Sequence, residues 1–340
     1  MSDTLGTLPR PDETIQWRAL DPADSGSLHG LIRELEQRDE ALSRTSPSEA
    51  EVMLGRPGLA EAIAAFVADD PTPDAPIAFG YVGLARSGKP EAICHGGVLP
   101  EFRGRGIGQQ LLDWQTERGT SLLNEVFPGV PGSIVHAVDA RRTAFHRHLE
   151  SLGYEWSHSF AELRHDLDAI PAPQGTSSFV EIVPWSGDWE EQVRKTLARQ
   201  ARLSGVAGDA TDPQWAGPQG HPDPALSFLA IDRRGDRTRV AGLVEVGRYR
   251  DDWEALGWSE GYIDTVAAFD PDIRGEVLGA LVTRALEAIK EAGLEKAAVG
   301  VNPQADPETM AFYDDIGFRP HAWWRHYARR AQAGPGAQES

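Results

Sequence analysis

Two segments of this chain repeat each other at a separation of about 170 residues. "PEFRGRGIGQQLL", from Pro100 to Leu112, aligns with "PDIRGEVLGALV", from Pro271 to Val282. "AFHRHLESLGY" and "AFYDDIGF" form a second matched pair further along each half. The units of solenoid repeats are much shorter, roughly 20 to 50 residues. The long repeat therefore predicts two copies of one domain, and 340 residues suffice for two separate cores.

The hydrophobic pattern predicts the same order of elements in both halves. In the first half we expect strands at 15–20, 77–86, 91–99 and 132–140, and helices at 25–42, 59–70, 107–123 and 141–154. In the second half we expect strands at 179–185, 225–232, 239–249, 261–269 and 296–302, and helices at 189–203, 276–293 and 306–318. A short Gly-Lys-Pro turn joins the strands at 77–86 and 91–99, which predicts an antiparallel pair.

The domain boundary is predicted from composition. Residues 168–178, "DAIPAPQGTSS", are rich in Pro, Gly and Ser and lack an apolar period, which is typical of a linker. We therefore predict domains at 14–167 and 179–330, with disordered ends at 1–13 and 331–340. The run 204–224 is longer than an ordinary connection. It is either a substrate lid that carries Trp215 or a flexible insertion.

The overall composition argues against several classes of function. A net charge of −19 opposes sequence-independent binding to nucleic acid, because that affinity comes mainly from Lys and Arg on phosphates. The same charge suits a cationic small-molecule substrate better. No apolar run approaches the roughly 20 residues that span a bilayer, so we expect no membrane association. The single Cys94 and the lack of a secretory signal pattern at the N-terminus favour the cytoplasm.

A glycine-rich turn connects the predicted strand at 91–99 to the predicted helix at 107–123. Free backbone N–H groups at the start of a helix, together with the helix dipole, favour a bound anion such as a pyrophosphate. Gly104 and Gly106 would let a ligand approach the main chain, while Arg103 and Arg105 add positive charge. The spacing fits neither a Walker loop nor a dinucleotide fingerprint. The alternative is a tight connection that binds nothing.

These residues resemble the signature of the GNAT superfamily of N-acetyltransferases, V-x-P-x-x-[RQ]-x-x-G-x-[GA]. Every specified position matches, at Val98, Pro100, Arg103, Gly106 and Gly108. The resemblance covers both halves and implies an α/β protein of two tandem domains. Each would have a mixed, mostly antiparallel central sheet whose central strands splay apart, flanked by helices.

The resemblance also implies how acetyl-CoA is held. Its pyrophosphate would lie on the first-copy loop, which comprises Arg103, Gly104, Arg105, Gly106, Ile107 and Gly108. The main-chain N–H near Val98, freed where the strands splay, would be the oxyanion-type donor, and Phe269 is its counterpart in the second copy.

The second copy departs from the signature within this loop. Val277 stands where the first copy has Gly106, and Glu276 adds negative charge where a diphosphate would lie. We expect this site to bind the cofactor less well, or not at all. The matching Arg274, Gly275 and Gly279 are then either weak cofactor contacts or the remnant of a helix cap.

The helix near each domain's end shows the opposite asymmetry. Tyr313 lies four residues before Gly317, where the family often carries a tyrosine that protonates the departing thiolate. The alternative for Tyr313 is packing beside Phe312. The first copy has Leu149 at this position, which leaves His146 or His148 as the nearby proton donors.

Acetyl transfer to an amine requires the amine to be neutral, so a base or a water chain is needed. Before the first loop, Glu91 and His95 are the candidate bases, and His95 has the more suitable ordinary pKa. Before the second loop, Asp264 and Glu260 take similar places. For each of these residues the alternative is a structural side chain that is bonded to its neighbours.

The sequence predicts no metal site. The histidines at 146, 148, 158 and 165 lie close in sequence but lack a ligand spacing supported by carboxylates. The hypothesis is therefore a metal-free, acetyl-CoA-dependent N-acetyltransferase that acts on a primary amine of a small molecule by direct transfer within a ternary complex.

The tandem arrangement and length further resemble mycothiol synthase and its actinobacterial relatives, in which one half carries the catalysis and the other is degenerate. Two alternatives within the enzyme class are an antibiotic or polyamine N-acetyltransferase and a protein N-acetyltransferase. A third alternative is a catalytically inactive acetyl-CoA-binding sensor or interaction protein.

Overall fold

The computed structural model describes residues 8–10, 14–68, 75–85, 88–172, 175–203, 222–234, 238–304 and 307–332. The internal contacts divide the chain into two compact units, 1–157 with 325–340 and 158–324. This division differs from the predicted domains at two strands. The strand at 155–165 belongs to the first half of the sequence but lies mainly in the second unit, and the strand at 319–330 belongs to the second half but lies partly in the first unit. We keep 14–167 and 179–330 as the proposed limits of the two repeats in the sequence.

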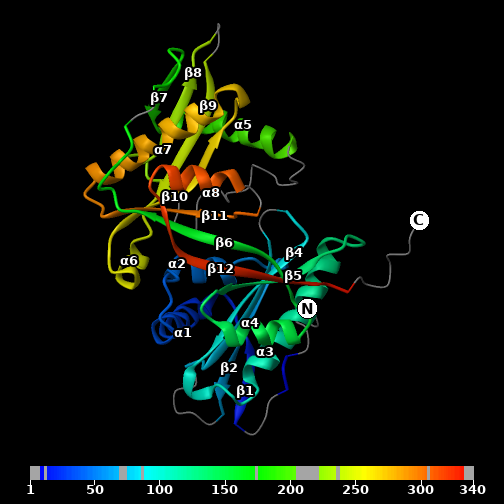
Figure 1. Cartoon of the computed structure of the whole chain (residues 1–340). Helices are drawn as coiled ribbons and strands as arrows, with labels where there is room; N and C mark the ends of the chain where they lie inside the picture. The colour runs from blue at the N-terminus through cyan, green and yellow to red at the C-terminus, as the bar shows by residue number, and fades with distance from the viewer. Residues whose placement is uncertain are drawn as a thin grey trace. The chain divides into compact units, whose positions relative to one another are not determined.

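The first unit is a mixed sheet with helices on both faces (Figure 1). Its elements are β1 (Ile15–Ala19), α1 (Ser25–Arg38), α2 (Pro47–Leu54), β2 (Ala60–Val67), β3 (Ala78–Leu84), β4 (Glu91–Val98), α3 (Ile107–Val126), β5 (Ser133–Asp139), α4 (Thr143–Ser151) and the end of β12 (Arg319–Arg330). The strand order is β1-β2-β3-β4-β5-β12. The first three pairs are antiparallel, whereas β4 and β5 are parallel.

The second unit repeats this plan. Its elements are β6 (Glu155–His165), β7 (Val180–Pro184), α5 (Glu190–Leu203), β8 (Phe228–Asp232), β9 (Arg239–Gly247), α6 (Arg250–Leu256), β10 (Glu260–Ala268), α7 (Arg274–Glu291), β11 (Lys296–Val301) and α8 (Pro307–Asp315). The strand order is β6-β11-β10-β9-β8-β7. The strands β10 and β11 are parallel, and the other neighbours in this order are antiparallel. The mixed, mostly antiparallel sheets confirm the predicted fold class.

The predicted helix at 59–70 is wrong, because residues 60–67 form the strand β2 between β1 and β3. Its alanines favour a helix in isolation, but pairing on both edges and burial decide the outcome here. The helix α2 lies earlier in the chain. Ser46 and Glu49 form a reciprocal capping box at its start, a sequence signal that precedes Pro47–Leu54.

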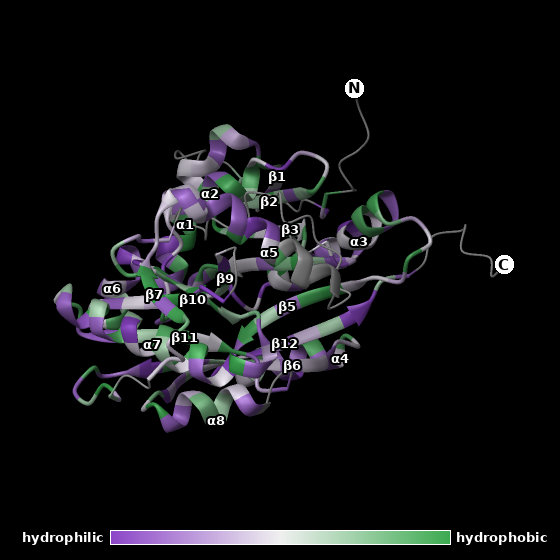
Figure 2. Ribbon diagram, turned by 90° about the horizontal axis from the view of Figure 1, so that it is seen from above, coloured by the Kyte–Doolittle hydropathy of each residue, from purple (hydrophilic) through white to green (hydrophobic). Residues whose placement is uncertain are grey.

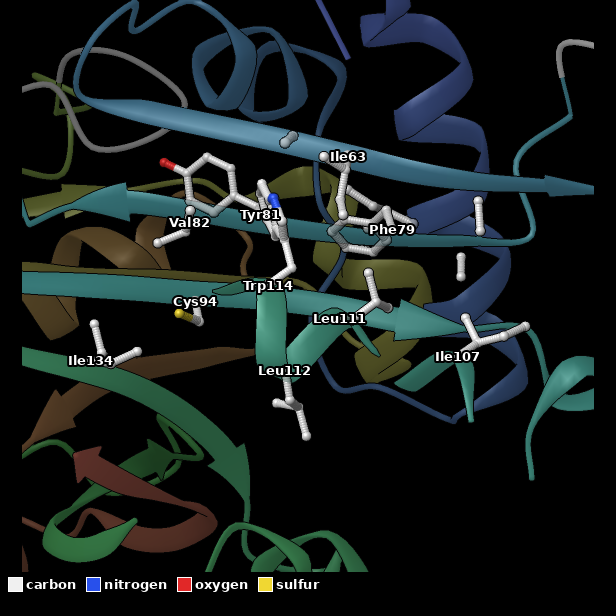
Figure 3. Close-up of a cluster of buried hydrophobic side chains, with 14 of the residues drawn as sticks. Ile63, Phe79, Tyr81, Val82, Cys94, Ile107, Leu111, Leu112, Trp114 and Ile134 are labelled. Carbon is white, nitrogen blue, oxygen red and sulfur yellow. The ribbon is translucent and has the colours of Figure 1, made fainter. Parts of the chain in front are cut away.

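Glycines let α3 approach the sheet of the first unit closely. A Cβ at Gly80 would lie 2.9 Å from Leu111 Cδ2, and one at Gly96 would lie 3.4 Å from Gln115 Nε2. Figure 3 shows Leu111 and Trp114 of α3 among the buried side chains next to β3 and β4. The position of α3 against β3 and β4 is therefore fixed by contact over several turns.

The helix α1 covers the opposite face of β4. A Cβ at Gly97 would lie 2.7 Å from Leu35 Cδ1 of α1, and successive residues of a strand face opposite sides. In Figure 2 the helices α1 and α7 carry alternating hydrophilic and hydrophobic residues, as expected for helices that cover a sheet. None of the helices in the described ranges has the length and apolar character needed to cross a membrane.

A buried ion pair links α3 to β2. Arg118 is 4% exposed and donates to Glu61 Oε1 at 2.7 Å, to Glu61 Oε2 at 2.8 Å and to Glu125 Oε1 at 2.9 Å. Removing the guanidinium would leave the carboxylate of Glu61, whose side chain is 14% exposed, without its cation.

We expect Arg118→Ala to lower the free energy of unfolding of the first unit by about 3 kcal/mol, the usual cost of breaking a buried pair. Urea unfolding would measure this. The matched control is Arg38→Ala, because Arg38 and Glu34 form an exposed pair in the same unit and surface pairs contribute less than about 1 kcal/mol. Equal losses for the two variants would contradict the assignment.

Candidate functional site

The strands β4 and β5 separate at a defined point. Their parallel register ends at Cys94 with His136, although β4 continues to Val98 and β5 continues to Asp139. We call residues 95–98 and 137–139 the fork, and Cys94 with His136 the fork base. This separation is the splayed sheet that the sequence resemblance implied.

A tight turn stands at the open end of the fork. Gly104 and Gly106 have φ values of +77° and +82°, which side-chain-bearing residues rarely adopt. A Cβ at either glycine would meet nothing within 4 Å, so the space beside the turn is open. Gly106 is the N-cap of α3 and provides no side-chain cap. The N–H groups at 107–109 therefore have no main-chain acceptor within the described ranges, and such groups suit an anion.

The two arginines of the turn bond to its own backbone. Arg103 Nε donates to Val98 O at 2.8 Å, and Arg105 Nη2 donates to Glu101 O at 3.1 Å. Arg103 Nη2 also bonds Asp39 at 2.8 Å, and Arg142 lies 3.1 Å from the same carboxylate. These contacts hold the turn in shape and keep positive charge beside it.

A cavity of about 400 Å³ lies on the same unit. It is lined by Arg38, Asp39, Glu40, Asp139, Arg141 and Arg142. Because Asp139 ends β5 and Asp39 bonds Arg103, the cavity adjoins the open end of the fork. Charged groups of both signs line it, which suits a polar ligand.

The second unit has no equivalent turn. The helix α7 begins at Arg274, directly after the short turn Pro271–Ile273, so Gly275 and Gly279 lie inside the helix. Val277 is 0% exposed and belongs to the core. Glu276 accepts hydrogen bonds from the backbone N–H and, at 2.9 Å, from the hydroxyl of Ser177. A carboxylate and helical backbone therefore occupy the place of the first-copy turn.

The predicted donor at Phe269 does not fit that role. Its N–H donates to Ala241 O at 2.7 Å, so this N–H is already bonded. In the first unit the equivalent bond runs from Leu99 N–H to Ile77 O at 3.0 Å. Alternate residues of an antiparallel strand turn their N–H groups to opposite sides. The N–H of Val98 therefore points toward the fork.

The structure brings His95, but not Glu91, to the fork. His95 is the first residue of β4 beyond the fork base, and it shares the α1 face with Gly97. Its side chain is accessible to solvent, yet desolvation by the surrounding protein lowers the pKa of the imidazole. His95 is therefore neutral at pH 7 and can accept a proton. Glu91 pairs with Ser133 about 13 Å further back along the strand.

The candidate bases of the second unit lie beside an irregular strand. The register of β10 with β9 shifts between Ile263 and Thr265, which places Asp264 at a bulge. Asp264 accepts a 2.5 Å hydrogen bond from Tyr249, and desolvation raises the pKa of its carboxyl to about 6. Glu260 is buried in an ion pair with Arg164 at 2.7 Å, which supports its structural alternative.

Sequence reasoning missed Glu245. This residue lies on β9 opposite Thr265, is 5% exposed, and has a pKa that burial raises to about 7. The available signal was one carboxylate in the otherwise apolar run "AGLVEV". Burial raises the pKa of both Glu245 and Asp264, and the charge of Asp264 contributes to the raised pKa of Glu245.

Of the predicted proton donors, Tyr313 and His146 are buried, whereas His148 is only half-buried. Tyr313 is 1% exposed, and its ring lies 5.2 Å from the rings of both Phe312 and Phe318, which supports the packing alternative. Leu149 is 0% exposed. His146 is also buried, and its Nε2 lies 3.0 Å from Asp139 O.

Two further expectations concern a metal and a lid. Across the described ranges, no group of three or more His, Cys, Asp or Glu side chains is arranged to hold a metal ion. The predicted lid at 204–224 lies outside the described residues over 204–221, which include Trp215.

Comparisons with known proteins identify the fold. No protein-family model and no curated protein matches the sequence. Among solved structures, the chain is similar to a GCN5-related N-acetyltransferase from Sphaerobacter thermophilus, with 18% identity, a TM-score of 0.68, and coverage of 96% of this chain and 98% of that chain. It is similar to a tandem GNAT protein from the clavulanic acid biosynthesis pathway, with 15% identity, a TM-score of 0.64, and coverage of 94% and 99%.

A third similar structure is a glucosamine N-acetyltransferase region in a fungal multi-domain β-N-acetylglucosaminidase. The identity is 16%, the TM-score is 0.67, and the match covers 94% of this chain and 38% of that chain. At these identities the likenesses show the fold, which is the tandem GNAT fold implied by the first-copy motif. They do not bear on the resemblance to mycothiol synthase, which stays a prediction.

The buried Glu245 makes the stability of the second unit dependent on pH. In the unfolded chain its carboxyl ionises near 4.5, but in the folded unit it ionises near 7. Stability is therefore highest below pH 4.5 for this group, and raising the pH through 7 removes roughly 3 kcal/mol. We expect Glu245→Gln to abolish most of the difference between urea unfolding at about pH 5 and about pH 8.

The matched control is Glu291→Gln, because the Glu291 side chain is 68% exposed. Its unfolding should follow the wild-type pH dependence. If Glu245→Gln also follows the wild-type curve, burial of the Glu245 carboxyl is not the cause of the pH dependence.

Proposed function

We propose that the chain is an acetyl-CoA-dependent N-acetyltransferase whose first unit binds the cofactor and acetylates a primary amine of a small molecule. One observation carries this proposal: the positive-φ turn at Gly104 and Gly106 leads into the uncapped start of α3, at the open end of the fork. The second unit lacks that turn. In the proposed reaction the acetyl group passes directly to the amine within a ternary complex, without a metal.

Different groups of the first unit would bind different parts of acetyl-CoA. The N–H groups at 107–109, with the positive charge of Arg103, would hold the pyrophosphate. The N–H of Val98 would bond the acyl arm along the fork. When bound, acetyl-CoA supplies an acyl group that is activated as a thioester. Its reacting end would lie at the fork base, next to His95.

His95 would act as the general base. Its neutral imidazole can take the proton that the amine loses as the new C–N bond forms, and its access to solvent lets that proton leave. The fork would hold the amine close to the acyl carbon, and such positioning can supply roughly 7 to 11 kcal/mol of the lowering of the barrier.

The acceptor is proposed as a small amine. A neighbour described as a glucosamine N-acetyltransferase region favours a compact amine, and the charged cavity at Arg141 and Arg142 suits a polar one. Polyamine, antibiotic and protein acceptors can be compared with small amines by measuring the release of CoA from acetyl-CoA with each amine in turn. A cytoplasmic location fits the single, buried Cys94.

We expect Gly106→Val to weaken acetyl-CoA binding by more than about tenfold in calorimetry. A β-branched residue with φ near +82° costs over 1 kcal/mol, and helical backbone would replace the turn as it does in the second unit. Val277→Gly should leave the affinity unchanged, although the lost buried side chain destabilises the second unit by roughly 2 kcal/mol.

Equal losses of affinity in the two variants would refute the assignment of the cofactor to the first unit. If wild-type protein binds acetyl-CoA but releases no free CoA with any amine, the sensor alternative holds instead.

We expect His95→Gln to lower kcat by about 100-fold, within the usual range for loss of a general base. In the wild type, kcat should fall as the pH drops through the pKa of His95, which lies below 6.5. The variant should lose that acid limb. The measurement is thiol release from acetyl-CoA between about pH 5 and pH 9.

Tyr313→Phe is the paired test of the second unit. It keeps the buried ring between Phe312 and Phe318, so turnover should stay within about twofold of wild type. A 10- to 100-fold loss would instead make Tyr313 the proton donor and place catalysis in the second unit.

A further inference from the structure

The fork base differs chemically between the two units. The last parallel pair is Cys94 with His136 in the first unit and Ile263 with Val299 in the second. The unit that keeps the glycine turn therefore has a histidine where the other unit has valine. The fold does not require a polar side chain at this position.

The His136 side chain is buried with an unmet bonding group. The residue is 5% exposed, and its Nε2 has no hydrogen-bond partner in the described part of the chain. Burial, with a smaller contribution from His95, lowers the pKa of His136 to about 3, so its ring is neutral. A buried nitrogen without a partner destabilises the fold by about 1 to 3 kcal/mol, so its presence needs an explanation, such as a bound ligand.

The neighbour of His136 also differs between the units. Tyr154 N–H bonds Leu149 O at 3.1 Å, and Phe318 N–H bonds Tyr313 O at 2.9 Å, so the two pairs occupy equivalent positions. In the first unit the helix position is leucine and the later position is tyrosine. In the second unit the helix position is tyrosine and the later position is phenylalanine, so the hydroxyl group lies at a different one of the two positions in each unit.

A hydrogen bond to Thr116 fixes the side chain of Tyr154. Thr116 Oγ1 donates to Leu112 O at 2.8 Å, so the hydroxyl of Tyr154 is the donor in its 2.8 Å bond to Thr116 Oγ1. The ring of Tyr154 meets His136 edge to face, with 5.0 Å between centroids and 79° between planes. Tyr154 thereby restricts the orientation of the imidazole.

The two histidines lie on opposite faces of the sheet. Gly96 faces Gln115 of α3, so Cys94, two residues before it, and its register partner His136 share the α3 face. His95 faces α1. Cys94 lies among the buried side chains beside α3 (Figure 3). An acyl thioester at the fork base would then have a base on one face and His136 on the other.

We propose that His136 donates a hydrogen bond from Nε2 to the sulfur of the thioester bound in the first unit, and that Tyr154 is the positioning residue for its ring. This inference rests on the proposed function. In the transfer, the amine nitrogen forms a bond to the acyl carbon and the C–S bond breaks. The electron pair goes to sulfur, whose thiolate His136 stabilises, and the amine proton goes to His95 and then to solvent.

Cys94 does not compete for the acyl group. Burial raises the pKa of its thiol, so it stays protonated and is a poor nucleophile. The orphan nitrogen of His136 is therefore the polar atom of the fork base that remains to meet the ligand.

The first test uses the residue that the second copy itself carries. We expect His136→Val to lower kcat by 10- to 100-fold while the acetyl-CoA dissociation constant changes by less than about threefold. His136→Gln retains an N–H donor and should restore at least part of kcat. The matched control is Val299→Ala at the other fork base, which should leave kcat unchanged.

The second test does not use turnover. The thiolate absorbance of bound CoA, titrated against pH, should show a lower thiol pKa in wild type than in His136→Val, with about a tenfold difference in the ratio of thiolate to thiol at a given pH. Tyr154→Phe keeps the ring but loses the bond to Thr116, and should show a smaller shift in the same direction. It also serves if His136→Val fails to fold.

The outcomes separate the two proposals. Failure of wild-type protein to bind CoA overturns the proposed function. If CoA binds and its thiol titrates identically in wild type, His136→Val and His136→Gln, only the role of His136 is overturned. The same holds if His136→Val weakens acetyl-CoA binding but leaves kcat intact.

Discussion

The close packing of α3 on β3 and β4 is the constraint from which the first unit's site follows. Gly80 and Gly96 present no side chain of their own to α3, so the helix packs close to the sheet, and it begins shortly after the end of β4. The chain has few residues in which to reverse direction, and it does so through left-handed backbone at Gly104 and Gly106. That conformation leaves the helix N–H groups facing open space, and a site for an anion results from packing and chirality together.

The second unit shows what happens when one of these conditions is removed. Valine in place of Gly106 disfavours a positive φ, and the helix then extends back to Arg274, the residue aligned with Arg103. In the extended helix, the N–H groups that the turn would expose take part in the helix's own hydrogen bonds. Glu276 accepts a hydrogen bond from Ser177. Loss of this glycine therefore accompanies the change from a turn to a helix, while the strand order and the core are kept. The two copies share a fold in this way and differ in chemistry.

The sequence predicted the repeat, the glycine turn and nearly all central strands, because these depend on local pattern and on residues with special backbone freedom. It failed for β2, whose alanine-rich run favours a helix until β1 and β3 pair with it. It also predicted no strand at 155–165 or 319–330, so β6 and β12 were missed together with their places in the compact units. Glu245 and His136 were missed for a related reason: each is one polar residue in an apolar strand, and only pairing and burial show what surrounds it.

The two copies together show which buried polar residues the fold itself does not require. A polar group without a partner opposes folding by about 1 to 3 kcal/mol, and an apolar residue of suitable volume removes that cost. Val299 shows that this fold accepts the apolar choice at the fork base, and Phe318 shows the same at the neighbouring aromatic position. The first unit keeps His136 and Tyr154 there, in the same unit that keeps the glycine turn. Stability alone does not account for both, whereas a ligand that enters between the strands and meets the free nitrogen does.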